Sequence, residues 1–168
     1  GHLLLDDTMW AKFSMDLRES LPGATFDLAG EVFEDLRIRK DEAELEVLRR
    51  AGALADEVSE SIRGMGEAAI GMTEAELARE IERRLADAGG DEPSFETIVG
   101  SGPHGAMPHH THGDREIQPG DPVVLDFGAF VDHYPGDQTR TVVFDGDPPE
   151  EYETVHETVL EATNTAID

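Results

Sequence analysis

Two aspartates in a segment of strand-forming residues carry the clearest chemical signal in the sequence. Asp126 lies inside the apolar run Val123–Phe127, and Asp137 follows in the segment Gly136–Thr139. A carboxylate is costly in an apolar interior unless something pairs with it, so Asp126 requires a partner. If both aspartates belong to one antiparallel hairpin, divalent cations held between them would be that partner, because carboxylates can bridge the ions of a two-metal site.

The position of the turn decides whether these two carboxylates meet. A turn at Val131-Asp132 would set Asp126 and Asp137 directly opposite each other, with Cβ atoms about 4.5–5.5 Å apart. A turn at Tyr134-Pro135-Gly136, which local turn chemistry favours, would shift the register and separate them. In a purely structural interpretation, Asp137 caps a turn and Asp126 accepts hydrogen bonds from backbone amides. The spacing alone leaves these interpretations open.

Four histidines lie in one Gly/Pro-rich loop predicted over residues 100–120, namely His104, His109, His110 and His112. Histidine is a frequent metal ligand and a proton carrier near neutral pH, so this is either a metal or catalytic loop or an exposed polar loop. His109 precedes the strand that carries Asp126, and its imidazole could hydrogen-bond an oxyanion beside that strand. No His-Glu-x-x-His motif is present, which argues against a zincin.

Periodicity predicts the elements that must position these residues. Capping pairs and apolar stripes predict one helix between Asp41 and Gly64 and a second between Thr73 and Gly89. We interpret both helices as packing elements and assign them no chemistry. Strands are predicted over residues 95–99, 122–130 and 138–144, and a last helix follows around residues 152–159. Helices followed by strands and then a helix predict an α+β fold.

Residues 1–40 form a separate segment of the sequence. Leu3–Leu5 predicts a short strand, and apolar residues at helical spacing between Trp10 and Leu21 predict a helix that Pro22-Gly23 ends. The charged stretch Arg37–Lys40 is the candidate linker. We therefore place a domain boundary between residues 40 and 41.

Acidic residues dominate the composition, with 38 Asp and Glu against 13 Lys and Arg and a net charge of −25. Such a surface repels nucleic acid and anionic membranes, so we expect neither as a partner. The chain has no cysteine, which excludes disulfides and thiolate zinc sites. It has no run of about 20 apolar residues that would cross a membrane. We expect a cytoplasmic protein, either from a halophile that accumulates salt or an ordinary acidic one.

Five motifs follow one another between residues 95 and 141: Phe95–Gly102, Met107–His109, Gly120-Asp121, Leu125–Ala129 and His133–Thr141. In this order they resemble the pita-bread metallopeptidases of family M24, which include methionine aminopeptidase, aminopeptidase P, prolidase and creatinase. The resemblance is strongest to Xaa-Pro dipeptidase and Xaa-Pro aminopeptidase.

The resemblance implies an α+β pita-bread fold of which the chain holds the first half of the catalytic domain. Residues 1–40 resemble the end of a creatinase-type N-terminal domain and linker, and residues 41–168 the N-terminal half of the peptidase domain. The implied activity is hydrolysis of Xaa-Pro bonds by a metal-bridging hydroxide, on peptides with proline at the second position. Two divalent ions (manganese, cobalt, iron or zinc) and a homodimer are also implied. The alternative is a catalytically inactive binding module of the same fold.

The resemblance also assigns roles to four residues. Asp126 and Asp137 match metal ligands, and His109 matches a histidine that binds substrate and stabilises the tetrahedral intermediate. Thr139 lies beside the second aspartate, where a hydrogen bond to a ligand is expected. A further histidine and two glutamates of the family have no matching context. We therefore expect a fragment that lacks three of five ligands, is inactive alone and leaves an apolar sheet and helix face uncovered.

We predict that molar KCl raises the melting temperature of the chain. Its carboxylates repel one another at low ionic strength, and salt screens that repulsion. Thermal unfolding followed by circular dichroism in low salt and in molar KCl measures the difference. Equal melting temperatures in both would identify an ordinary acidic protein instead.

Overall fold

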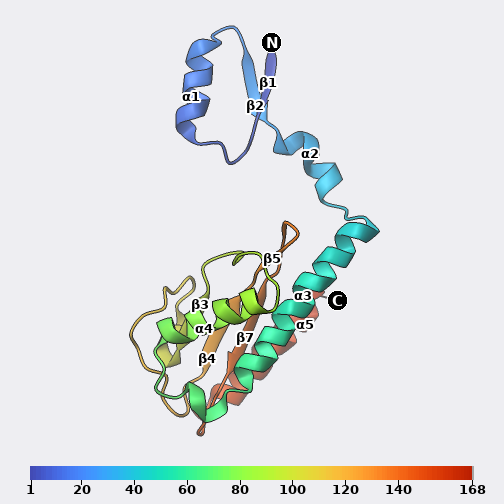
Figure 1. Ribbon diagram of the computed structural model, residues 1–168. Coiled ribbons are helices and arrows are strands. Elements are labelled where there is room, and N and C mark those ends of the chain that lie inside the picture. Colours follow the sequence, from blue (N-terminus) through green and yellow to red (C-terminus); the bar gives the residue numbers. More distant parts are fainter. Residues whose placement is uncertain (168) are drawn as a thin grey trace. The chain divides into compact units, whose positions relative to one another are not determined.

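The computed structural model describes residues 1–167 and contains two compact units, Gly1–Leu45 and the chain from Glu46 onward (Figure 1). In the first unit, β1 (His2–Leu5) pairs in parallel with β2 (Thr25–Leu28). Parallel strands need a crossover connection, and α1 (Ala11–Ser20) supplies it. The predictions for β1 and α1 are confirmed, whereas β2 and α2 (Gly30–Arg37) were not predicted.

Two amphipathic helices, α3 (Glu42–Arg63) and α4 (Glu74–Asp87), carry most of the helical part of the core. Both predicted capping boxes form. At the start of α4, the Glu76 amide donates to Thr73 Oγ1 at 3.1 Å, and the Thr73 amide donates to the Glu76 carboxylate at 2.8 Å. These bonds satisfy amide groups that a helix start leaves unpaired, and they fix where α4 begins.

Three antiparallel strands form the central sheet in the order β3 (Ile98–Ser101), β4 (Val123–Phe127) and β7 (Gln138–Val142). The prediction that the first of these strands begins at residue 95 was wrong, because β3 begins at Ile98 and continues through Gly100 and Ser101. Glycine and serine are poor strand formers, so the sequence pattern ended the strand too early.

The core lies between this sheet and the two helices, which Figure 1 shows in front of the strands. A strand alternates its side chains between two faces, and in β4 Val123, Leu125 and Phe127 are fully buried. A fully buried side chain of this size contributes about 1.5–3 kcal/mol. The other buried apolar residues of these elements are Ala51, Leu54, Ala55, Val58, Ile62, Leu77, Ala78, Ile81, Leu85, Val99 and Val142.

Asp126 lies on the other face of β4, away from this core, and is half-buried. The expectation that this carboxylate would be buried in an apolar interior was therefore wrong. Val124 shares that face and is also only half-buried. Because Val124 is apolar, the sequence of β4 resembles that of a strand covered on both sides. The sequence alone therefore does not show that only one face of β4 is fully buried.

A short hairpin joins β4 to β7. β5 (Phe130–Val131) pairs with β6 (Tyr134–Pro135), and the turn between them is Asp132-His133. The two turn residues have φ values of 46° and 71°. Positive φ at both central positions is the geometry that matches the twist of antiparallel strands. The turn therefore lies at neither of the two positions considered from the sequence.

The last helix, α5 (Tyr152–Ile167), exposes an apolar face. Val155, Val159 and Leu160 are 58%, 60% and 51% exposed. This agrees with the expected uncovered apolar helix face. Among residues 1–167, no helix combines the length and the apolar character needed to cross a membrane.

We predict that Gly128→Ala destabilises the protein by more than about 2 kcal/mol, because overpacking that forces the backbone to move has costs of this order. A Cβ at Gly128 would lie 2.0 Å from the carbonyl oxygen of Gly136, in the segment that leads to Asp137. Urea unfolding measures the effect.

Gly52→Ala is the matched control. Gly52 is exposed in α3, and a Cβ there meets no atom within 4 Å. Alanine favours a helix over glycine by up to about 1 kcal/mol, so this variant should be slightly more stable than the parent. Equal effects of the two substitutions would contradict the close approach of residues 128 and 136.

Candidate active site

The structure brings His109, Asp126 and Asp137 together around one cavity of about 370 Å³. Asp126 comes from β4, and Asp137 directly precedes β7. His109 comes from residues 102–122 between β3 and β4, which we call the histidine loop. The remaining lining residues are Phe95, Glu96, Ile98 and His110. Three side chains that the sequence singled out from separate segments therefore face one space.

The register of β4 and β7 explains how the two aspartates share the cavity. Asp126 is paired with Thr139 across the ladder, and Asp137 lies two residues before Thr139. Residues two apart on a strand project from the same face, so the aspartates are diagonal neighbours, with Cα atoms about 7–8 Å apart in a regular ladder. The turn that would set them directly opposite and the turn that would separate them are both excluded.

Thr139 orients the first aspartate. Its hydroxyl donates a hydrogen bond to Asp126 Oδ1 at 2.8 Å. The sequence placed Thr139 beside Asp137, but the hydrogen bond crosses the ladder to Asp126. A hydrogen bond of this kind holds a metal-ligating carboxylate in a fixed direction.

His109 has an unusual backbone conformation. Its φ is 56°, in the left-handed region that residues other than glycine rarely adopt, and its side chain is exposed. Such a conformation costs about 1–3 kcal/mol and persists only when the surrounding chain enforces it. A strained residue whose imidazole lines a cavity with two carboxylates is typical of a functional position.

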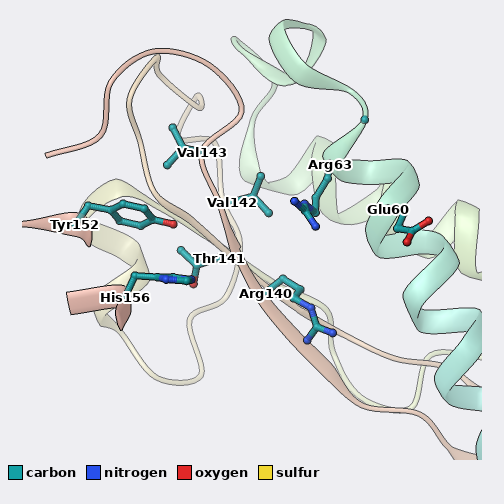
Figure 2. A pocket seen from close by; sticks show the side chains of 9 residues that line it. Glu60, Arg63, Arg140, Thr141, Val142, Val143, Tyr152 and His156 are labelled. Atoms are coloured by element: carbon teal, nitrogen blue, oxygen red, sulfur yellow. The ribbon is translucent and has the colours of Figure 1, made fainter. Parts of the chain in front are cut away.

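A larger cavity of about 750 Å³ lies elsewhere in the second unit (Figure 2). Arg63, Arg140, Tyr152 and His156 are among its lining residues, and Glu60 is its carboxylate. Neither aspartate nor His109 reaches it. The larger cavity has one carboxylate beside two arginines, whereas the smaller one has two aspartates and two histidines and is the better candidate for binding a cation.

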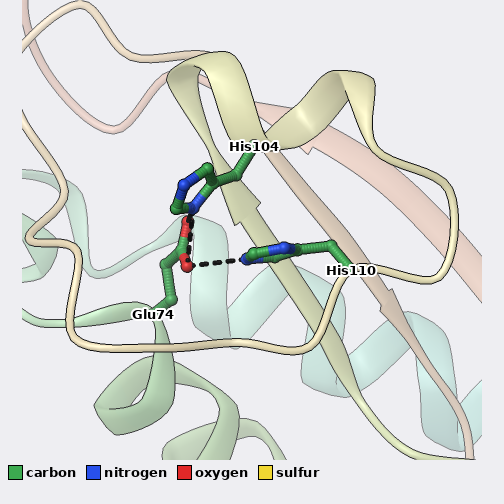
Figure 3. A group of neighbouring side chains, drawn as sticks. All are labelled: Glu74, His104 and His110. Carbon is green, nitrogen blue, oxygen red and sulfur yellow. Dashed lines mark hydrogen bonds and ion pairs between the residues drawn. The ribbon is translucent and has the colours of Figure 1, made fainter.

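Glu74, the first residue of α4, lies fully buried under the histidine loop (Figure 3). Its Oε1 accepts hydrogen bonds from the backbone amide and the hydroxyl of Ser101, each at 2.8 Å. His104 Nδ1 lies 2.9 Å from Oε1, and His110 Nε2 lies 2.9 Å from Oε2. Burial raises the pKa of the Glu74 carboxyl, but these hydrogen bonds outweigh it and lower the pKa to about 2.

The histidines of the loop differ in exposure and contacts. The side chains of His104 and His110 are only 32% and 11% exposed, and their rings lie 4.4 Å apart. His112 Nδ1 lies 2.9 Å from the Thr97 carbonyl oxygen. His104, His110 and His112 are therefore packed against the rest of the unit, although most other residues of this segment are exposed.

Sequence reasoning missed Glu74. Acidic residues are common in the first turn of a helix, where they interact favourably with the helix dipole. Glu74 and Glu76 both fit that pattern, yet only Glu74 is buried. Its spacing to the loop histidines forms no short motif, so no signal in the sequence separates it from the capping residues.

A family model described as metallopeptidase family M24 matches residues 46–168. Among curated proteins, the chain is 37% identical over 143 residues to a protein named Xaa-Pro dipeptidase from Pyrococcus furiosus. That match covers 85% of this chain and 40% of the relative. The chain thus spans less than half the length of this relative.

Two solved structures agree with these matches. A prolidase from Thermococcus sibiricus superposes with a TM-score of 0.91 at 38% identity, covering 99% of this chain and 45% of that one. An X-Pro aminopeptidase from Thermotoga maritima superposes with a TM-score of 0.81 at 30% identity, covering 97% and 46%. The α+β fold is accordingly a half of the pita-bread arrangement, as the resemblance implied.

We predict that Glu74→Gln lowers the free energy of unfolding by about 3 kcal/mol near neutral pH. The reason is that the lowered pKa of the Glu74 carboxyl means that the folded state favours its ionised form, which glutamine cannot adopt. The pKa is about 2 in the folded chain against an ordinary value of 4.5. The stabilisation is therefore complete above pH 4.5 and is lost as the pH falls through about 2. Urea unfolding in metal-free buffer measures this effect. The difference in unfolding free energy between the parent and the Glu74→Gln variant should decrease from pH 7 to pH 2.

Glu57→Gln is the control for this experiment, because Glu57 is exposed on α3. Exposed substitutions usually change stability by less than about 0.5 kcal/mol. A difference between the Glu74→Gln variant and the parent that does not depend on pH would contradict the ionised, hydrogen-bonded state of Glu74.

Proposed function

The chain belongs to metallopeptidase family M24, and from this premise we propose that the protein is a metal-dependent peptidase that hydrolyses Xaa-Pro bonds. The observation that supports the proposal best is the convergence of Asp126, Asp137 and His109 on one cavity. The names of similar proteins, Xaa-Pro dipeptidase, prolidase and X-Pro aminopeptidase, give the substrate class. A catalytically inactive binding module would not require these three side chains to meet.

The side chains of the cavity fit a site for two divalent ions. Carboxylate oxygens suit manganese, and they also bind zinc, cobalt and iron. Asp126 and Asp137 project from the same face, and Thr139 holds the first of them in a fixed direction. When bound, such ions lower the pKa of a bound water molecule and polarise a carbonyl group.

The residues of the chain have separate roles in this proposal. Asp126 and Asp137 hold the cations, and His109 donates a hydrogen bond to the oxygen of the scissile carbonyl as negative charge develops there. Phe95 and Ile98 add apolar surface to the same cavity. The nitrogen of an Xaa-Pro bond carries no hydrogen, so the cavity needs no acceptor for it.

The remaining ligands are proposed to come from outside the 168 residues. The resemblance implies a further histidine and two glutamates, whereas the chain spans 40% of the Pyrococcus furiosus relative. On this proposal the 168-residue chain alone is inactive, and the whole protein cleaves dipeptides or peptides with proline at the second position. A homodimer in the cytoplasm is the proposed state of assembly and location.

We predict that Asp126→Asn or Asp137→Asn lowers kcat/KM at least about 10³-fold, because a bound ion supplies several kcal/mol and each 1.4 kcal/mol is tenfold. The measurement is release of proline from an Xaa-Pro dipeptide by the full-length protein that contains this chain, assayed with Mn²⁺. Removal of metal by a chelator should abolish the reaction.

Asp114→Asn is the matched control, because Asp114 is an exposed aspartate of the histidine loop and does not line the cavity. It should retain the parent rate. Full activity in the Asp126→Asn or Asp137→Asn variant would contradict the assigned site. Absence of Xaa-Pro cleavage by the unsubstituted protein would contradict the proposed function itself.

A further inference from the structure

Glu74, His104 and His110 form a second group of potential metal ligands, which includes neither aspartate and shares only His110 with the lining of the aspartate cavity. Glu74 comes from α4, His104 from the 3₁₀ turn Gly102–Ala106 after β3, and His110 from the loop that follows (Figure 3). One ligand atom from each residue lies within 4.8 Å of the others. Two segments distant in sequence, the start of α4 and the histidine loop, therefore present one carboxylate and two imidazoles to the same point.

The charges around this group leave one negative charge without a fixed counter-ion. The Glu74 carboxylate is fully buried. The neighbouring guanidinium of Arg115 donates to Ser101 Oγ at 2.5 Å, but it also pairs with Asp121 at 2.6 Å. Because Arg115 pairs with Asp121, none of the arginines or lysines that the structure describes forms an ion pair with Glu74, and a bound cation would balance its charge.

The distances suit a cation. Zinc-type ions bind imidazole nitrogen and carboxylate oxygen at about 2.0–2.2 Å, so two ligand atoms of one tetrahedrally coordinated ion lie about 3.3–3.6 Å apart, slightly farther than hydrogen-bonded atoms. Glu74 Oε2 lies 3.1 Å from His104 Nδ1 and 2.9 Å from His110 Nε2. Small side-chain rotations would bring all three atoms to bonding distance of one ion.

The carboxylate is already oriented for this role. Ser101 donates two hydrogen bonds to Oε1, and the Gly113 amide donates to Oε2 at 3.3 Å. Bonds to one oxygen of a carboxylate direct the other oxygen, as the outer partners of metal ligands do in metalloproteins. Oε2 consequently faces both imidazoles.

We propose that Glu74, His104 and His110 bind a divalent transition-metal ion of the zinc and cobalt class, at a site that shares only His110 with the aspartate cavity. Two histidines and one glutamate are a known ligand set for zinc, with a further position left for water. The ion would join the start of α4 to the loop that carries His109. Its role is structural, because it fixes the loop on both sides of the strained residue.

The site is complete within the 168-residue chain, so the chain itself can be tested. Co²⁺ is the probe, because tetrahedral coordination by nitrogen and oxygen gives visible absorption bands. The background is the Asp126→Asn/Asp137→Asn double variant, which removes the aspartate cavity as a competing site. We expect one equivalent of Co²⁺ to give this spectrum, Zn²⁺ to displace it, and Zn²⁺ to raise the melting temperature.

Variants at the ligands and beside them complete the test. His104→Gln and His110→Gln, made in the same background, should each weaken Co²⁺ binding at least tenfold and remove the Zn²⁺ effect on melting. His112→Gln is the matched control, because His112 lies in the same loop and contacts the Thr97 carbonyl instead. The His112→Gln variant should bind Co²⁺ with the same affinity as the background protein. Far-UV circular dichroism verifies that each variant is folded.

Two results would overturn the proposal. One is the absence of a Co²⁺ spectrum and of a Zn²⁺ effect on melting in the folded background protein. The other is binding that survives both His104→Gln and His110→Gln. Either result would mean that the cluster is a hydrogen-bond network without a metal.

Discussion

The register between β4 and β7 is the constraint on which both the core and the candidate active site depend. Side chains alternate along a strand, so a shift of one residue would bring Asp126 into the core and expose Leu125. The Asp132-His133 turn fixes this register, and the same register aligns Thr139 with Asp126. The burial of apolar residues under α3 and α4 thus also sets the direction of the carboxylates.

Much of this arrangement could be predicted from the sequence, because it rests on local patterns. The capping residues Thr73 and Glu76, the apolar stripes of the helices and the strand-forming segments gave the order of elements. The turn of the hairpin was harder to predict. Its turn uses Asp132 and His133 at positive φ, where glycine or asparagine is usual, while Pro135-Gly136 provided a stronger but misleading turn signal.

The candidate active site was predictable only through the resemblance. Spacing alone left open whether Asp126 and Asp137 meet, and its only argument for His109 was that the loop could return beside the strand of Asp126. The role of Thr139 was anticipated, but its partner depends on the cross-strand register, which one sequence does not reveal. Glu74 lay beyond prediction, since its importance comes from burial and from contacts with residues far along the chain.

The histidine loop connects the aspartate cavity with the cluster of Glu74, His104 and His110. His109 has a left-handed backbone and lines the aspartate cavity, and the next residue, His110, contacts both that cavity and Glu74. A strained conformation persists only where neighbouring contacts over-determine it. The buried carboxylate of Glu74, fixed by Ser101 at the end of β3, provides such contacts. The loop histidines therefore have different tasks: His104 and His110 hold the loop in place, and His109 is presented to the cavity.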